Sequence, residues 1–498
     1  MKMKKIYQAI LLGTITMSFT ACSLDIDPIS DATEITEGTS SQVGNSPTLK
    51  NRQAALDQRT NLYNLLRDRQ EHWSLDKKLI ADTHSDNAYA GTTGAEVVPF
   101  ETNSIDPSNS VLSRDWNRYL EDIAKSNVLI VSCDSLLKHG LISDAENKQW
   151  KAEGKIFRAM VMFEMARLWG SFPLITTLAE TITYDNIDEV YPTYFPPKST
   201  REECYAQIVS DLEEGERYAP DHKPEDRTVM SKVVAQAMLT KVYAELHEYD
   251  KVIAYAEKVR GATGMQLEPD FATLWAYDAE KKDCVKHNTS ESILEVTNID
   301  NWEVWMYTSP ENDPGFWFTW AKWITPSRDL INAFNAEGDV VRYEQTVAWL
   351  SCDWSNYYPE SHYAFMNKCR SNRTNRYMLR LPDIILLEAE AYAEQGNGSK
   401  AAELVNIVRD RAKLAPVNGS GDMKETVLKE RRLELALEGE RWFDLVRTGN
   451  VEKYMNNVYS KDNGRLAQKR TFDENSYLLP IPQTALDENV NLEQNPGY

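Results

Sequence analysis

The sequence lacks the local motifs that mark the common enzyme classes. It has no GxSxG, Walker A, GxGxxG or HExxH pattern, and its 7 histidines include no His-x-His pair. Two carboxylates can cleave a glycosidic bond, but none of the 76 acidic residues lies in a diagnostic motif. We therefore predict a protein that is not an enzyme, with no catalytic residue and no cofactor.

Cysteine is scarce as well. The chain has 6, without the CxxC or Cys/His spacing of a metal site, so we predict no bound metal. Cys133 and Cys204 lie in helical patterns and are expected in the core. Cys352 and Cys369 leave two alternatives open, a disulfide or two free thiols. The stretch Asp82–Asp86 (DTHSD) keeps a metal alternative open, because its histidine has an aspartate on either side.

An excess of basic residues and a long apolar run are both absent. The formal net charge is −21, and binding to a phosphate backbone needs clustered Lys and Arg, so nucleic acid is excluded as a partner. No segment after the N-terminus approaches the roughly 18 apolar residues of a membrane span. Hydrophobic residues make up 42% of the chain, which is enough for a large core.

The N-terminus has the composition of an export signal. A basic start at residues 2–5 is followed by an apolar stretch over 6–19, and the small residues Thr and Ala then precede Cys22. This pattern is typical of a bacterial lipobox. We predict a signal peptide over 1–21, lipidation of Cys22 with acyl chains such as palmitate, and a polar tether over 22–50. An ordinary secretory signal with an incidental cysteine is the alternative.

Most of the remaining chain has the apolar spacing of amphipathic helices. Two overlapping capping boxes at 199–203 predict a helix start, and Gly170 with Pro173 predicts a helix end. We expect helices at 51–73, 115–137, 154–169, 200–212, 229–246, 251–260, 382–395, 401–412 and 430–449. Consecutive short helices joined by short loops are typical of tetratricopeptide-like hairpins.

The stretch 430–449 (ERRLELALEGERWFDLVRTG) is predicted to form one long helix. Gly439 would lie on its buried face and let another backbone come close, since glycine inside a helix costs about 1 kcal/mol. Trp442 is assigned to the core, as is Trp169. The carboxylates of this stretch are expected on a solvated or salt-bridged face, namely Glu438, Glu440 and Asp444.

Between 264 and 375 the helical periodicity is mostly lost, and Pro, Gly, Asn and Trp accumulate. Residues 292–297 (SILEVT) predict a buried strand. An aromatic segment at 301–323 has the inventory of a sugar site, because flat rings pack on the C–H faces of sugars while Asn and Asp bind hydroxyls. Its candidate ligand contacts are Trp302, Trp305, Tyr307, Trp317, Trp320 and Trp323. The alternative is that these rings fill a satellite core.

Several segments together resemble the SusD/RagB family of Bacteroidetes outer-membrane nutrient-binding lipoproteins. The chain carries that family's motifs at 326–342, 380–412, 430–449 and 478–498, although Val490 stands where a proline is common. A further family motif is carried by Arg158, Ala159, Arg167, Trp169, Gly170, Phe172, Pro173 and Leu174.

The resemblance implies a mainly α protein with a tetratricopeptide-like scaffold and an irregular, loop-rich subregion with a few short strands. It implies one domain over 51–498, with the scaffold at 51–263 and 376–498 and the ligand-binding insertion at 264–375. It further implies that Asn87 and Tyr89, in an N-terminal loop, contact the ligand.

The function that the resemblance implies is capture of an oligosaccharide or polysaccharide at the cell surface. The protein would sit in the outer membrane by its lipid anchor only and deliver glycan to a SusC-like TonB-dependent transporter. Two alternatives stay open: a surface glycoside hydrolase with aromatic sugar subsites, and a pure interaction adaptor.

Overall fold

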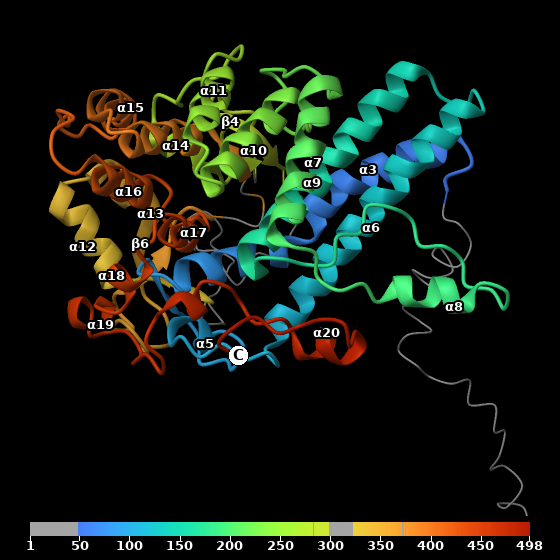
Figure 1. Cartoon of the computed structure of the whole chain (residues 1–498). Coiled ribbons are helices and arrows are strands. Elements are labelled where there is room, and N and C mark those ends of the chain that lie inside the picture. The colour runs from blue at the N-terminus through green and yellow to red at the C-terminus, as the bar shows by residue number, and fades with distance from the viewer. Residues whose placement is uncertain (1–47, 282, 298–321, 371–372, 374) are drawn as a thin grey trace, which may run out of the picture. The chain divides into compact units, whose positions relative to one another are not determined.

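The computed structural model describes residues 48–281, 283–297, 322–370, 373 and 375–498 (Figure 1). These fall into two compact units, the larger of which consists of Thr48–Thr177 and Phe195–Tyr498. The described part of the smaller unit is Leu178–Tyr194, with the helix α8 (Ile187–Val190) and the 3-10 turn η4 (Tyr191–Tyr194). The predicted signal peptide and Cys22 lie outside the described residues, and the domain boundaries stay predictions.

The larger unit is mainly helical. Its N-terminal half contains α3 (Arg52–Asp68), η2 (Glu71–Leu75), α4 (Asp76–Lys78), η3 (Leu79–Thr83), α5 (Val98–Glu101), α6 (Ser110–Lys138), α7 (Asp144–Trp169), α9 (Arg201–Tyr218), α10 (Lys232–Glu245), α11 (Tyr249–Arg260) and η5 (Phe271–Leu274). Its C-terminal half contains α12 (Arg328–Glu337), α13 (Val340–Thr346), α14 (Leu381–Glu394), α15 (Gly398–Arg411), α16 (Met423–Glu434), α17 (Arg441–Arg447), α18 (Val451–Met455), α19 (Val458–Lys461), η7 (Glu474–Ser476) and α20 (Gln483–Glu488). In the part of the chain that the structure describes, no helix combines the length and apolarity needed to cross a bilayer.

Local sequence sets the helix ends. Thr200 caps α9 and forms the predicted capping box with Glu203, so that two otherwise orphaned backbone N–H groups are satisfied. Gly170 ends α7 at a φ of 77°, a conformation that favours glycine. The helix α14 starts with a proline in its first turn, where the missing N–H costs nothing.

The long helices pack as successive antiparallel pairs. Helix α7 packs between α6 and α9, and α10 packs on α9 and α11. The chain then leaves this layer for more than a hundred residues and returns with α14 and α15. Figure 1 shows that α14 lies beside α10 and α11, and α15 beside α14. The predicted mainly α fold with a hairpin scaffold is confirmed.

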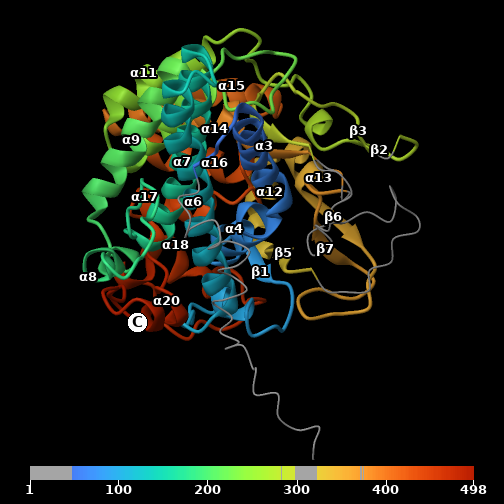
Figure 2. The same ribbon diagram turned by 90° about the vertical axis from the view of Figure 1, so that its right-hand side faces the viewer.

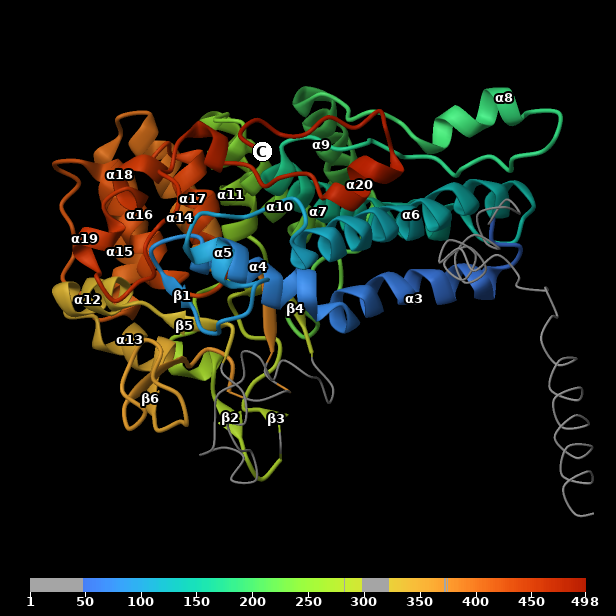
Figure 3. The ribbon, with the colours of Figure 1, turned by 90° about the horizontal axis from the view of Figure 1, so that it is seen from below.

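Within the described residues, the strands form four small antiparallel sheets of two strands each. The pairs are β1 (Ala88–Ala90) with β5 (Ile324–Pro326), β2 (Tyr277–Asp278) with β3 (Asp283–Cys284), β4 (Ser292–Val296) with β8 (Arg376–Arg380), and β6 (Val347–Leu350) with β7 (Tyr363–Met366). The buried strand predicted at 292–297 is β4. Figures 2 and 3 show the β2–β3 and β6–β7 hairpins together on one side of the helical layer.

The prediction of one long helix over 430–449 is wrong. Helix α16 ends at Glu434 and α17 begins at Arg441, with a turn between them in which Leu437 and Gly439 have φ of 61° and 85°. The Gly439 N–H donates to Asp82 Oδ2 at 2.9 Å, a bond that a continuous helix would not make. The apolar periodicity runs through this α16–α17 turn because its leucines are also buried.

Core assignments made from the sequence are confirmed. Trp169 and Trp442 have relative exposures of 0% and 2%, and Trp169 Nε1 donates to the carbonyl of Pro480 at 3.1 Å. Cys133 and Cys204 are buried in helices. Cys352 and Cys369 form no disulfide with each other, so the disulfide alternative is wrong.

We expect Gly439→Ala to lower the free energy of unfolding by about 2 kcal/mol. At a φ of 85° an L side chain is strained, and its Cβ would lie 3.0 Å from the Lys77 side chain, which two ion pairs hold in place. Gly140→Ala is the matched control, since its φ is 68° but nothing lies within 4 Å of the new Cβ. Urea denaturation measures the free energy of unfolding of both variants. If Gly439→Ala and Gly140→Ala lose the same amount, the predicted clash with Lys77 is wrong.

Candidate ligand-binding cavity

Most of the predicted aromatic contacts lie outside the described residues, namely Trp302, Trp305, Tyr307, Trp317 and Trp320. Trp323 is described and half-buried. Its carbonyl accepts a hydrogen bond from Gly91 N at 2.9 Å, and its side chain packs against the hydrophobic core. A role of these six rings in ligand binding stays a prediction.

Asn87 and Tyr89 lie in the interior, with no exposed surface. The Asn87 amide donates to Asp82 at 3.0 Å and accepts from Arg432 at 2.9 Å. The Tyr89 hydroxyl donates to Asp462 at 2.5 Å, and its ring stacks on another tyrosine at a centroid distance of 4.4 Å. Their placement therefore gives no support to the prediction that they contact a ligand.

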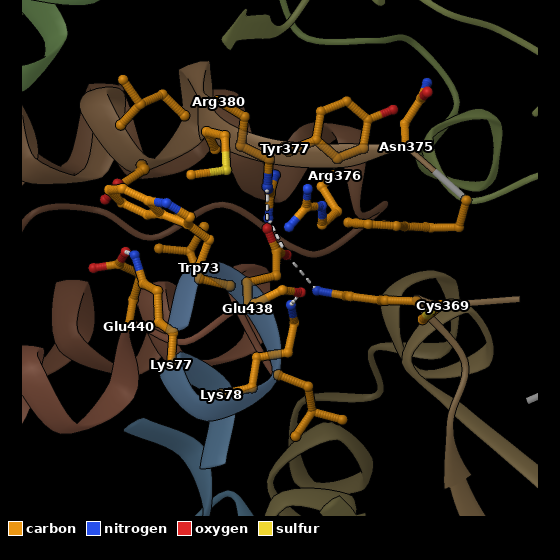
Figure 4. A pocket seen from close by; sticks show the side chains of 18 of the residues that line it. Trp73, Lys77, Lys78, Cys369, Asn375, Arg376, Tyr377, Arg380, Glu438 and Glu440 are labelled. Carbon is orange, nitrogen blue, oxygen red and sulfur yellow. Dashed lines mark hydrogen bonds and ion pairs between the residues drawn. The ribbon is translucent and has the colours of Figure 1, made fainter. Parts of the chain in front are cut away.

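A narrow cavity of about 70 Å³ lies where four segments of the larger unit meet (Figure 4). Its lining comes from η2 and α4, from the residue after η5, from described residues of β7, β8 and the start of α14, and from the α16–α17 turn. The volume exceeds what one water molecule needs, but it is far below the about 300 Å³ of a pocket that encloses a whole small ligand. The cavity can hold a few water molecules or one substituent of a larger ligand.

Three aromatic side chains form part of the lining: Trp73, Trp275 and Tyr377. Trp275 meets Tyr377 edge to face, with ring centroids 5.4 Å apart and an interplanar angle of 90°. Trp73 meets Tyr119 in the same way at 5.9 Å, behind the cavity wall. Edge-to-face packing of this kind stabilises each ring position by about 1 kcal/mol.

Several polar atoms on this lining are buried without a hydrogen-bond partner. The indole nitrogens of Trp73 and Trp275 and the side-chain oxygen of Asn375 have none among the described residues. The three side chains are only 4%, 5% and 2% exposed. An unsatisfied buried donor or acceptor costs about 1–3 kcal/mol, so these three atoms are a local cost to the fold beside the cavity.

Ion pairs fix one wall of the cavity. Arg380 donates twice to Glu438, at 2.6 and 2.7 Å, and Lys368 donates to the same carboxylate at 2.6 Å; Figure 4 draws these bonds. Burial acts to raise the pKa of Glu438, but the two cations outweigh it and leave that pKa below its ordinary value. Burial lowers the pKa of Lys368. The carboxylates of the α16–α17 turn are thus salt-bridged, as expected from the sequence.

The opposite wall is held by Lys77. Its ammonium lies 3.1 Å from Glu164 and 3.1 Å from Glu440. Glu440 also contacts Arg167 and Lys241, both at 3.0 Å. Burial opposes ionisation of Glu440, yet these cations hold its pKa well below the ordinary value. The cavity is therefore framed by charges whose positions are determined by buried partners.

Behind this wall, Glu434 is the centre of a buried cluster. It is fully buried and contacts Arg380 at 2.5 Å, Arg342 at 3.2 Å and Arg411. Burial alone would raise the pKa of Glu434, but the three guanidinium groups hold it well below its ordinary value. Since Arg380 also binds Glu438, the cluster positions the cavity wall.

The metal alternative at His84 finds no support in the geometry. His84 Nδ1 lies 2.7 Å from the carbonyl of Phe100, the ring packs on Trp442 at 4.1 Å, and burial lowers its pKa to about 4. Asp86 is held by Arg441 at 2.8 and 2.9 Å. In the described ranges, no three His, Cys, Asp or Glu side chains are grouped as a metal site.

Two wider grooves also occur in the larger unit. One of about 570 Å³ lies between the end of α11, residues 265–269 and the α14–α15 hairpin, and one of about 350 Å³ lies along α3 beside β4. Neither carries more than one of the aromatic rings of the protein. The narrow cavity is the place where aromatic, cationic and unsatisfied polar groups meet.

No local pattern in the sequence marks the aromatic residues of the cavity. Trp73 follows a helical pattern and Tyr377 lies in a short strand, so both resemble ordinary core residues. They meet only because the chain returns from the loop-rich subregion to pair β8 with β4.

Comparison with known proteins gives two matches to protein-family models. Residues 38–244 match a family described as "Starch-binding associating with outer membrane", and residues 353–498 match the "SusD family". Together the matched ranges include most of the helical scaffold on both sides of the loop-rich subregion.

Curated relatives and solved structures agree with these matches. The chain is 28% identical to SusD-like protein P2 of Formosa agariphila over 78% of its own length and 81% of that protein. It has the fold of a laminarin binding SusD-like protein, with a TM-score of 0.69, 24% identity and coverage of 90% and 100% of the two chains. For surface glycan-binding protein A from Bacteroides fluxus, the TM-score is 0.72 at 19% identity, covering 90% and 100%.

We expect Glu434→Gln to cost about 3–5 kcal/mol of unfolding free energy, because it leaves three buried arginines without their shared charge. The folded pKa of Glu434 lies below its unfolded value of about 4.3, so its charge stabilises the fold above that pH. This stabilisation is lost as the pH falls through the folded pKa, and the variant should lack that part of the pH dependence.

Denaturant titrations of wild type and variant between neutral and acidic pH measure this difference. Glu403→Gln is the control, since its pair with Lys400 is exposed and screened by solvent, so its loss should change the stability far less. A variant as stable as wild type at neutral pH would contradict the role given to Glu434.

Proposed function

Because this chain belongs to the SusD/RagB family, we propose that it is a cell-surface lipoprotein that binds glycan and delivers it to a SusC-like TonB-dependent transporter. The observation that carries the proposal is the pair of family matches at 38–244 and 353–498, which flank a subregion with five tryptophans in 301–323. The matched ranges carry most of the helical scaffold, and the tryptophan-rich segment lies between them.

Two observations support carbohydrate as the ligand. Relatives of the same fold are named for laminarin binding and for surface glycan binding. The aromatic inventory at 301–323 fits the chemistry of sugars, whose apolar C–H faces pack on flat rings while their hydroxyls need hydrogen bonds. We assign the first contacts with glycan to Trp302, Trp305, Tyr307, Trp317, Trp320 and Trp323.

Surface attachment rests on the lipobox-like sequence that ends at Cys22. The matched family is described as associating with the outer membrane, which agrees with an anchored protein. Several acyl chains on one N-terminal residue would hold the folded units at the membrane without a spanning helix. The transporter partner rests on family membership, and the helical scaffold is the face that we assign to it.

The protein acts by binding without cleavage in this proposal. Within the described cavity no carboxylate pair can act as an acid and a nucleophile, since its acidic residues are all bound to cations. A carboxylate held in its charged form by two or more cations cannot donate a proton to a leaving group.

We expect Trp320→Ala to weaken binding of the recognised glycan by about tenfold, the loss of roughly 1.4 kcal/mol of stacking energy. A glycan array followed by titration of the strongest ligand measures this effect. Tyr184→Ala is the control, because it removes an aromatic ring that is 96% exposed in the smaller unit. Equal affinity of wild type and Trp320→Ala would contradict the site, and reducing ends released by the pure protein would contradict a binding function.

We expect Cys22→Ala to move the protein from the membrane fraction to the soluble fraction, because it removes the acylated side chain. Fractionation of cells that express each form, with metabolic labelling by a palmitate analogue, measures both anchoring and acylation. Cys352→Ala is the control, since that thiol lies within the folded unit. Persistent membrane association of an unlabelled Cys22→Ala protein would exclude the lipid anchor.

A further inference from the structure

In the part of the chain that the structure describes, Asp82 is a fully buried carboxylate without an ion pair. It lies in η3 and has no exposed surface. Its Oδ1 accepts a hydrogen bond from the Asn87 amide at 3.0 Å and its Oδ2 accepts one from the Gly439 N–H at 2.9 Å, and both donors are neutral. The neighbouring carboxylates are all paired with Lys or Arg, namely Asp86, Glu438 and Glu440.

Burial without a cation makes the charge of Asp82 costly. Burial raises the pKa of Asp82 to about 6, and the two hydrogen bonds and the more distant charges of Lys78 and Lys368 offset only part of that rise. In an unfolded chain an aspartate has a pKa of about 3.9. Because the folded pKa is the higher one, the contribution of Asp82 to stability is fully present below about pH 3.9 and is lost as the pH rises through the folded pKa.

The hydrogen bond from Gly439 to Asp82 joins η3 to the α16–α17 turn. Gly439 has a φ of 85° and stands between Glu438 and Glu440, which both line the narrow cavity. A hydrogen bond to a charged acceptor is roughly twice as strong as one to a neutral acceptor. The charge state of Asp82 therefore determines how strongly the backbone of this part of the cavity wall is held.

The other charged or titratable side chains around η3 come from the elements packed against it, namely Lys78, His84, Asp86, Tyr89, Glu101, Lys368, Arg432, Glu438, Glu440 and Arg441. Burial acts against the charge of the three paired carboxylates, but their cations hold the pKa of each below its ordinary value. Burial lowers the pKa of His84 to about 4. Burial raises the pKa of Glu101, but this carboxylate accepts from the N–H groups of Ala90 and Leu466 and not from the turn.

We propose that Asp82 is a proton-controlled tie between η3 and the α16–α17 turn, strong while its carboxylate is charged at neutral pH and weakened when it takes up a proton in mild acid. The proton comes from solvent and stays on Asp82, whose oxygen then accepts from Gly439 as a neutral group. Uptake removes the cost of a buried charge from the whole fold, yet it weakens the local bond, so the two effects have opposite signs. The tie does not depend on glycan binding.

The experiment follows the Gly439 amide by NMR in the full-length protein, deuterated and labelled with ¹⁵N-glycine. The chain has only 21 glycines, so the spectrum is simple, and Gly439→Ala identifies the Gly439 resonance. The amide proton shift and the rate of hydrogen exchange are measured between about pH 5 and 7.5, a range that includes the folded pKa of Asp82. Gly170 is the internal reference, because its N–H donates to the carbonyl of Ala166 at 3.0 Å, which does not titrate.

We expect the Gly439 amide proton to titrate with a midpoint near pH 6. Its protection from exchange, corrected for the intrinsic rate, should be about fivefold lower at the acidic end, as the change from a charged to a neutral acceptor predicts. Asp82→Asn cannot titrate and should abolish both changes. Glu101→Gln is the matched control, because it removes a second buried carboxylate that accepts from backbone N–H groups, and it should leave both changes in place.

Three results would overturn the tie. The first is a Gly439 resonance that does not move in this pH range, and the second is the same titration in Asp82→Asn. The third is a titration with unchanged or higher protection in acid, since Asp82 would then be a buried acid that does not control the turn. If Asp82→Asn does not fold, the wild-type titration and Glu101→Gln decide, because loss of the titration in Glu101→Gln would assign it to the wrong carboxylate.

Discussion

The buried ion cluster of the α16–α17 turn is the constraint on which the rest of the larger unit depends. Glu434 joins three arginines that come from α13, β8 and α15, and Glu438 joins the β8 arginine to Lys368. Charges taken out of water are stable only when their partners are complete, so each of these elements fixes the others. The loop-rich subregion is thereby tied to the helical hairpins.

The same cluster connects stability with the candidate site. Arg380 and Glu438 line the cavity, and Arg380 also pairs with Glu434, the carboxylate that binds the buried Arg342 and Arg411. A cavity wall built in this way is ordered before a ligand arrives, which reduces the entropy lost on binding. The indole nitrogens of Trp73 and Trp275 stay buried beside the cavity with no hydrogen-bond partner among the described residues, which is a local cost of this packing.

Short-range patterns in the sequence predict the elements that depend only on residues close together in the chain. The capping box at Thr200, the stop at Gly170, the strand β4 and the core positions of Trp169 and Trp442 follow from spacing and residue type. The turn at Gly439 was missed because its apolar residues stay buried in a non-helical backbone, and its bond to Asp82 joins residues far apart in sequence. The cavity was missed for the same reason, since its aromatic residues come from segments that only the tertiary fold brings together.

We propose that the irregular subregion at 264–375 holds the glycan, while the helical hairpins serve as its scaffold. Hydrogen–deuterium exchange of the anchored protein, with and without a saturating glycan, tests it most directly. We predict slower exchange on binding in peptides from 264–375 and from the α16–α17 turn, and unchanged exchange in α9 to α11 and in α15. Protection confined to the hairpin helices, or none in 264–375 with the ligand bound, would contradict the claim.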